Sequence, residues 1–208
     1  IYSLNWQYNP MPGVALTGES AIGRSRVGAE GTAKTRSSGT AHRIAFEGVG
    51  EPHRLTFDYE RVSPDFETLL GSATPDREKI RARWRFRQSN VASWTYGMLW
   101  YRDNLDHSKV NGTTNFYKPE IGYTVRRLFD RQYSSATASY KMDLQRGGRY
   151  ANNHFLNLGY RDRFGIIDTD TNLGLISYYS RNQTDNLEYT LNTTLSTRQS
   201  SGNIIYRP

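Results

Sequence analysis

The stretch IRARWRFRQSNVASWTYGMLW, from Ile80 to Trp100, alternates polar and apolar residues over most of its length. Side chains two residues apart in an extended strand lie on the same face. By this rule one face of the first half carries Arg81, Arg83 and Arg85. The opposite face carries Ile80, Ala82, Trp84 and Phe86. The first half is therefore predicted to be a β-strand with one solvated face and one apolar face.

The second half repeats the alternation after four turn-like residues, RQSN (87–90). Its apolar positions are Trp94, Tyr96, Met98 and Trp100. The residues behind them are smaller and more polar, namely Ser93, Thr95 and Gly97. Two alternating runs joined by a short turn indicate an antiparallel hairpin.

The same period of two recurs along most of the chain, and helical periodicity is nearly absent. Clear examples are YSLNWQY (2–8), HRLTFDYER (53–61), YSSATASYKMDLQ (133–145) and NNHFLNLGYRDR (152–163). Counting such runs predicts about ten to twelve strands, many of them about ten residues long. The fold class predicted is all-β and antiparallel, with the whole chain, 1–208, as a single domain or a contiguous segment of one.

The two faces can be tested by pairing neighbouring strands, because a slip of one residue would bring the wrong faces together. If 55–61 pairs with 78–84, the apolar side chains Leu55 and Trp84 face each other. The polar partners are then Asp58 with Arg81, Glu60 with Lys79, and Thr56 with Arg83. Opposite charges therefore meet on the solvated face, and each such pair contributes about 0.2–1 kcal/mol.

Composition narrows the class of protein. The net charge of +7 is spread along the chain rather than gathered in one patch, so no nucleic-acid partner is expected. The mean hydropathy is −0.75, and no run approaches the ~18 apolar residues of a membrane helix. Strands of ~9–11 alternating residues nevertheless suffice to cross a bilayer. Because soluble sheets use shorter strands, the strand length favours an antiparallel transmembrane β-barrel, complete here or part of a larger barrel.

The predicted connections also suit such a barrel, since short turns alternate with longer polar loops. Short turns are expected at 87–90 and 129–132, and longer loops at 62–76, 103–115, 145–152 and 180–186. The segment 18–45 is rich in small residues and has no bulky apolar face. It is expected to form either two strands, where the wall meets a plug or partner, or a loop.

A spacing of five residues carries a resemblance to a known class of protein. The residues are Tyr59, Pro64, Phe66, Gly71 and Asp76, within LTFDYERVSPDFETLLGSATPDRE. This pattern, about fifty residues with the following strand and YRDNLD, resembles bacterial outer-membrane β-barrels. Among them it is similar to the large barrels of the type 9 secretion translocon and of porin–cytochrome conduits. The resemblance implies a porin-like or translocon-like barrel in a Gram-negative outer membrane.

The ends of the chain depart from that class. The sequence closes on GNIIYRP rather than on a strand with a terminal Phe, and it opens on strand-like residues rather than on the pattern of a signal peptide. We therefore expect either a segment of a longer barrel or a mature chain trimmed to its ordered part.

Two sets of residues are candidates for function. Pore-lining side chains are expected to be Arg81, Arg83, Arg85, Asp58, Glu60 and Thr56; the alternative is that these arginines only fill and solvate the interior. Lipid-facing aromatic side chains are expected to be Trp84, Phe86, Trp94, Tyr96 and Trp100, because Trp and Tyr gather at membrane interfaces. There is no cysteine, and no histidine spacing typical of a metal site, so neither a metal nor a cofactor is expected.

The sequence thus predicts a non-enzymatic barrel acting as a passive pore, a translocation conduit or a sheath around a partner. Its expected surroundings are outer-membrane lipid and lipopolysaccharide, with a periplasmic or plug protein as a further partner. The alternative is a soluble or surface-exposed β-sandwich module, whose exposed Tyr and Trp would bind glycan or protein.

Overall fold

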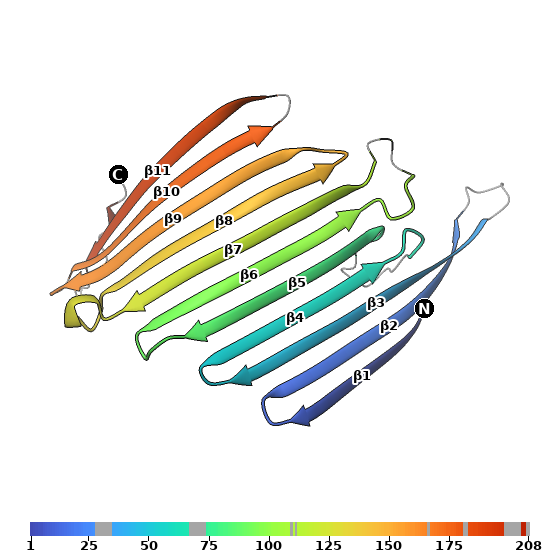
Figure 1. Ribbon diagram of the computed structural model, residues 1–208, viewed down its shortest axis with the longest axis horizontal. Helices are drawn as coiled ribbons and strands as arrows, with labels where there is room; N and C mark the ends of the chain where they lie inside the picture. Colours follow the sequence, from blue (N-terminus) through green and yellow to red (C-terminus); the bar gives the residue numbers. More distant parts are fainter. Residues whose placement is uncertain are drawn as a thin grey trace. The chain divides into compact units, whose positions relative to one another are not determined.

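The computed structural model contains one antiparallel sheet whose strands follow one another in chain order (Figure 1). It describes residues 1–27, 35–66, 74–108, 110, 112–165, 167–180, 183–197 and 205–206. The strands are β1 (Tyr2–Met11), β2 (Val14–Val27), β3 (Thr35–Gly50), β4 (His53–Val62), β5 (Arg77–Arg87), β6 (Ala92–Asp103), β7 (Thr114–Arg126), β8 (Ser135–Gly147), β9 (Ala151–Phe164), β10 (Ile167–Ser180), β11 (Gln183–Thr197) and β12 (Ile205–Tyr206). The prediction of an all-β antiparallel fold is confirmed.

The strands are long, from 10 residues in β1 to 16 in β3, except for the two-residue β12. In the described residues the only helical element is the 3-10 turn η1 (Leu128–Asp130). None of these residues forms a helix long and apolar enough to cross a membrane. β1 and β12 are the end strands of the order and do not pair with each other in the described parts of the chain, so this sheet is not closed into a barrel.

The small-residue segment 18–45 lies in two paired strands wherever the structure describes it. The pairing of β2 with β3 runs without interruption from Val14↔Gly48 to Val27↔Thr35. Residues 28–34, between these strands, lie outside the described part of the chain. β3 continues beyond the end of β4, because Val62 of β4 pairs with Ala41.

The connection from β1 to β2 shows why one glycine is required. Gly13 has a φ of +79°, and its carbonyl oxygen accepts a hydrogen bond of 2.6 Å from the amide of Val49. A Cβ at this position would lie 2.3 Å from the Val49 carbonyl oxygen. Any larger residue would therefore be strained and would also separate the turn from β3.

The contacts divide the chain into two compact units that interleave along the sequence. The first unit contains Ile1–Trp84, Met98–Tyr117 and Gln145–Tyr150. The second contains Arg85–Gly97, Lys118–Leu144 and Ala151–Pro208. The apolar core of the described residues is very small, because the buried hydrophobic residues are only Ala21, Val62 and Phe66. Most large apolar side chains are therefore on the surface of their unit.

Candidate functional site

One face of the first unit is apolar and exposed. The register places Tyr8 beside Leu16, Leu16 beside Phe46, and Phe46 beside Phe57, so a row of apolar side chains crosses four strands. The neighbouring row contains Trp6, which packs flat over Gly18: a Cβ on Gly18 would lie 2.2 Å from the indole ring. Tyr8 is 61% exposed. A soluble protein rarely exposes an apolar area of this extent without a partner.

The second unit has a face of the same kind. Leu158 of β9 pairs with Leu173 of β10, which pairs in turn with Leu191 of β11. The adjacent row holds Leu156, Leu175 and Tyr189. Leu191 is 67% exposed. Alternation predicted which residues share this face, whereas the exposure is a finding of the structure.

Charged groups on the apolar side of the first unit stand at the ends of strands. Arg102 donates from Nε to Glu78 Oε2 over 2.6 Å, and the Tyr59 hydroxyl donates to Glu78 Oε1 over 2.9 Å. Glu78 is the second residue of β5, and Arg102 is the last but one of β6. The apolar face is thus bounded by an ion pair rather than interrupted by one.

The predicted lipid-facing aromatic residues make polar contacts near strand ends. In the first unit the indole of Trp84 donates to His53 Nδ1 over 3.2 Å, and Arg102 lies 6.0 Å from the ring of Trp100. In the second unit Trp94 donates to Gln88 over 3.1 Å and stacks 6.1 Å from Tyr96. Phe86 of β5 is half-buried. That these rings face lipid stays a prediction.

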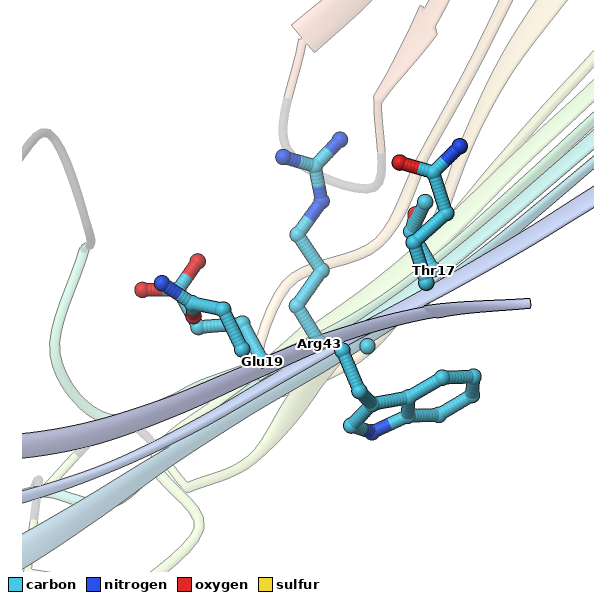
Figure 2. A pocket seen from close by; sticks show the side chains of 7 residues that line it. Thr17, Glu19 and Arg43 are labelled. Atoms are coloured by element: carbon cyan, nitrogen blue, oxygen red, sulfur yellow. The ribbon is translucent and has the colours of Figure 1, made fainter.

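The opposite face of the first unit is polar, and Figure 2 shows a recess on it. The recess has a volume of about 420 Å³ and includes Thr17, Glu19 and Arg43, whose side chains project to the same side of the strands (Figure 2). Arg43 also contacts β4, because its Nε and Nη2 both donate to Asp58 Oδ2, over 2.8 and 2.5 Å. This cation therefore joins the polar faces of β3 and β4.

The predicted register of β4 with β5 places Lys79 beside Glu60 and Arg81 beside Asp58, and the structure shows an ion pair for the first of these. Lys79 pairs with Glu60, as predicted. Asp58 pairs with Arg43 rather than with Arg81. The physical reason is that Asp58 has strands on both sides, and the guanidinium of β3 reaches it diagonally, from the residue opposite Glu60.

Arg81 is left with no hydrogen-bond or ion-pair partner among the described residues. It lines a recess of about 300 Å³ together with Thr56, Asp58 and Arg43. Arg83 takes part in an interaction of its own, and Arg85 belongs to the second unit. The structure therefore brings Thr56, Asp58 and Arg81 into one polar recess, and their role as pore-lining residues stays a prediction.

The polar face of the second unit carries ion pairs that the sequence analysis did not identify. Lys118 donates to Asp143 over 2.6 Å. Arg161 and Arg163 pair with Asp170 and Asp168, over 2.5 and 2.6 Å. The alternation could have predicted the pairs between β9 and β10. β9 carries two arginines and β10 two aspartates, each pair two residues apart, so opposite charges meet when the strands pair.

A further functional group missed in the sequence is Asp162, which is only 1% exposed. Its Oδ2 contacts Arg131 Nη1 at 2.8 Å and accepts a 2.8 Å hydrogen bond from the Tyr160 hydroxyl. The amide of Arg163 donates to Oδ1 over 2.7 Å. Arg131 lies between β7 and β8, and its guanidinium also stacks 4.0 Å from the ring of Phe164. This contact holds the connection against β9, and the connection is longer than the predicted turn 129–132.

The residues that carried the resemblance lie where loops meet strands in the first unit. Tyr59 contacts Glu78, Phe66 is 4% exposed, and Asp76 Oδ1 accepts a 2.5 Å hydrogen bond from the amide of Leu105. Pro64 is half-buried. Gly71 lies outside the described residues. The described residues of this spacing therefore lie at the two ends of the connection between β4 and β5.

Among the described residues no group of three or more His, Cys, Asp or Glu side chains could hold a metal ion. His107 contacts the Thr113 hydroxyl at 3.0 Å. His154 contacts the Tyr140 hydroxyl at 2.7 Å. These two histidines therefore have local hydrogen-bonding partners within the sheet and its loops.

No protein-family model, no curated protein and no solved structure matches this chain.

The pairing of Lys79 with Glu60 can be measured as a coupling free energy. A double-mutant cycle with Lys79→Gln and Glu60→Gln is expected to give about 0.5–1 kcal/mol, because both side chains are about one quarter exposed and solvent screens the pair. Urea unfolding of the four variants measures it. The same cycle between Arg81 and Asp58 is expected to give less than about 0.3 kcal/mol, and a larger value there would show that the predicted pairing was right.

Proposed function

We propose that this chain forms part of the wall of an outer-membrane β-barrel, which acts as a passive conduit through a polar, arginine-bearing interior. The observation that carries the proposal is the exposed apolar face of each unit. Exposure of Leu191 and Tyr189 at 67% and 77% is unfavourable in water and favourable against hydrocarbon. Lipid chains are the partner of matching chemistry, and the long strands suit a tilted crossing of a bilayer.

The boundaries of the apolar face support the same proposal. A residue that is charged and faces lipid is costly at the centre of a bilayer and cheap near the interface. The pair of Glu78 with Arg102, and the buried Asp162 with Arg131, both stand at strand ends. Trp94 and Trp100 also lie near strand ends, which is typical of interfacial aromatic girdles.

The polar face supports a water-filled interior. It carries charged side chains with open recesses between them, as in the surroundings of Arg43 and Arg81. Such groups are stable where water remains in contact with them. No chemical step is proposed, since passage along this face requires diffusion alone.

A bilayer also demands that the edge strands be paired, because unpaired backbone groups are costly in hydrocarbon. Every residue of β1 is exposed, and its outer edge has no strand beside it in the described chain. The proposal therefore requires further strands beside β1 and beside β11–β12 to complete the barrel.

The experiment is extraction and reconstitution of the full protein. A barrel is expected to need detergent for solubility, to migrate differently on a gel before and after heating, and to release small solutes from liposomes. Solubility in buffer without detergent, with unchanged mobility on heating, would contradict the proposal. That result would favour a soluble sheet that binds glycan or protein through its exposed aromatic residues.

The arginine-bearing interior predicts a preference for anions. Replacing Arg81 by glutamate is expected to lower the anion-to-cation permeability ratio about two- to fivefold, because a fixed positive charge becomes negative in the polar recess. Reversal potentials in a salt gradient across a planar bilayer measure the ratio. Arg54→Glu is the matched control. Arg54 is the second residue of β4 and pairs with Glu47, and their side chains are 60% and 45% exposed, so a smaller change is expected. An equal change in both variants would show that the charge of Arg81 affects the permeability ratio no more than the charge of Arg54 does.

A further inference from the structure

A short segment after β4 folds back over the polar face of the first unit. Val62, Ala41 and Ala21 are directly paired across β4, β3 and β2, and they share the face that also carries Arg43 and Glu60. Phe66 packs against this row. Val62 and Phe66 are 1% and 4% exposed, so the segment 63–66 covers an apolar area on this face.

Two hydrogen bonds and one close approach hold the segment in place. The amide of Ser63 donates to the Thr40 carbonyl over 2.9 Å, and the amide of Thr40 donates to Ser63 Oγ over 2.7 Å. A Cβ on Gly39 would lie 2.2 Å from the amide nitrogen of Phe66 and 2.4 Å from the carbonyl carbon of Asp65. Because these atoms are backbone, no side-chain movement would relieve the clash.

The far end of the same connection is tied as well. The amide of Asp76 lies 3.4 Å from the Ser63 carbonyl oxygen, which brings the two ends of the connection together. Asp76 Oδ1 accepts the amide of Leu105, and the neighbouring Asn104 is fully buried. The Asn104 carbonyl accepts the Thr113 hydroxyl over 3.1 Å. Hydrogen bonds therefore link the segment 63–66 to the residues before β5, and those residues to the connection that follows β6.

We propose that the segment 63–66 is a fixed constriction that limits the size of solutes entering along the polar face. The backbone of the segment lies against Gly39, and the packing of Phe66 holds it there. This inference rests on the proposed function, because it needs the polar face to line a conduit. This arrangement also explains why segment 18–45 is rich in small residues. They leave room on the face for a backbone to lie on, which a strand of ordinary side chains would not allow.

The test compares Gly39→Val with Gly50→Val in the full protein. Both glycines are in β3, but a Cβ on Gly50 meets nothing within 4 Å, so that variant is the matched control. Release of uncharged sugars and polyethylene glycols of graded size from liposomes gives the size limit. Gly39→Val is expected to raise it, and to raise single-channel conductance about 1.5- to threefold. Gly50→Val is expected to behave like the wild type.

A thiol reporter shows independently whether the segment has moved. The chain has no cysteine, so Val62→Cys introduces a single buried thiol. It is expected to react with a bulky maleimide at least tenfold faster when Gly39→Val is also present. Phe66→Ala, which removes this packing without crowding the strand, should increase both the thiol rate and the size limit.

The outcomes separate the two proposals. A fast thiol rate with an unchanged size limit in Gly39→Val and in Phe66→Ala would overturn the constriction while leaving the conduit intact. An unchanged thiol rate in both variants would show that Gly39 and Phe66 do not hold the segment 63–66 in place. Absence of any solute release by the wild type would overturn the proposed function, and the constriction with it.

Discussion

Replacement of Leu158 by arginine is expected to destabilise the protein in lipid by about 2–4 kcal/mol, the cost measured for a cation on the lipid face near the centre of a bilayer. Leu158 is in the middle of β9 and 40% exposed, and it lies beside Leu173 on the apolar face. In water an exposed leucine is replaced at a cost within about 0.5 kcal/mol. The size of this effect therefore measures whether the face meets hydrocarbon.

The matched control is the neighbouring residue of the same strand. Asn157 points to the polar face, and Asn157→Arg is expected to change the free energy of unfolding by less than about 1 kcal/mol, because that face is solvated. Equilibrium unfolding in urea in lipid vesicles, followed by tryptophan fluorescence, compares the two. Equal and small effects would indicate that both faces of β9 lie in water.

Replacement of Asp162 by alanine is expected to cost about 2–3 kcal/mol, because the buried carboxylate satisfies three donors at once. Those donors are the Arg131 guanidinium, the Tyr160 hydroxyl and the Arg163 amide. Asp170→Ala is the control. Asp170 pairs with Arg161, whose side chain is 68% exposed, so less than about 1 kcal/mol should be lost.

The same urea experiment measures both aspartate variants. Arg131→Ala should also be destabilising, because it leaves the buried Asp162 carboxylate without its cation and removes the donor to the Arg163 carbonyl. The three variants should also differ in proteolysis of the connection between β7 and β8, which Arg131 holds against β9. If Asp170→Ala were as destabilising as Asp162→Ala, the burial of Asp162 would not explain the loss of stability in Asp162→Ala.

Much of the fold could be predicted from the chain alone. The strands, the antiparallel order and the two faces all follow from alternation, as in the run from Ile80 to Trp100. The ion pair of Lys79 with Glu60 also followed, because an apolar face fixes the register of neighbouring strands. The strand length suggested a barrel, complete here or part of a larger one. This sheet is not closed into a barrel, and closure would depend on partners for the edge strands.

Alternation is a local property of the backbone, so a sequence records it residue by residue. Side-chain contacts that involve a third strand, or that depend on the path of a loop, leave no such local pattern in the sequence. Arg43 reaches Asp58 diagonally, Arg131 reaches Asp162 from a turn, and the segment 63–66 lies on Gly39. Each of these contacts joins parts of the chain whose separation in sequence has no fixed period, and only the folded structure brings them together.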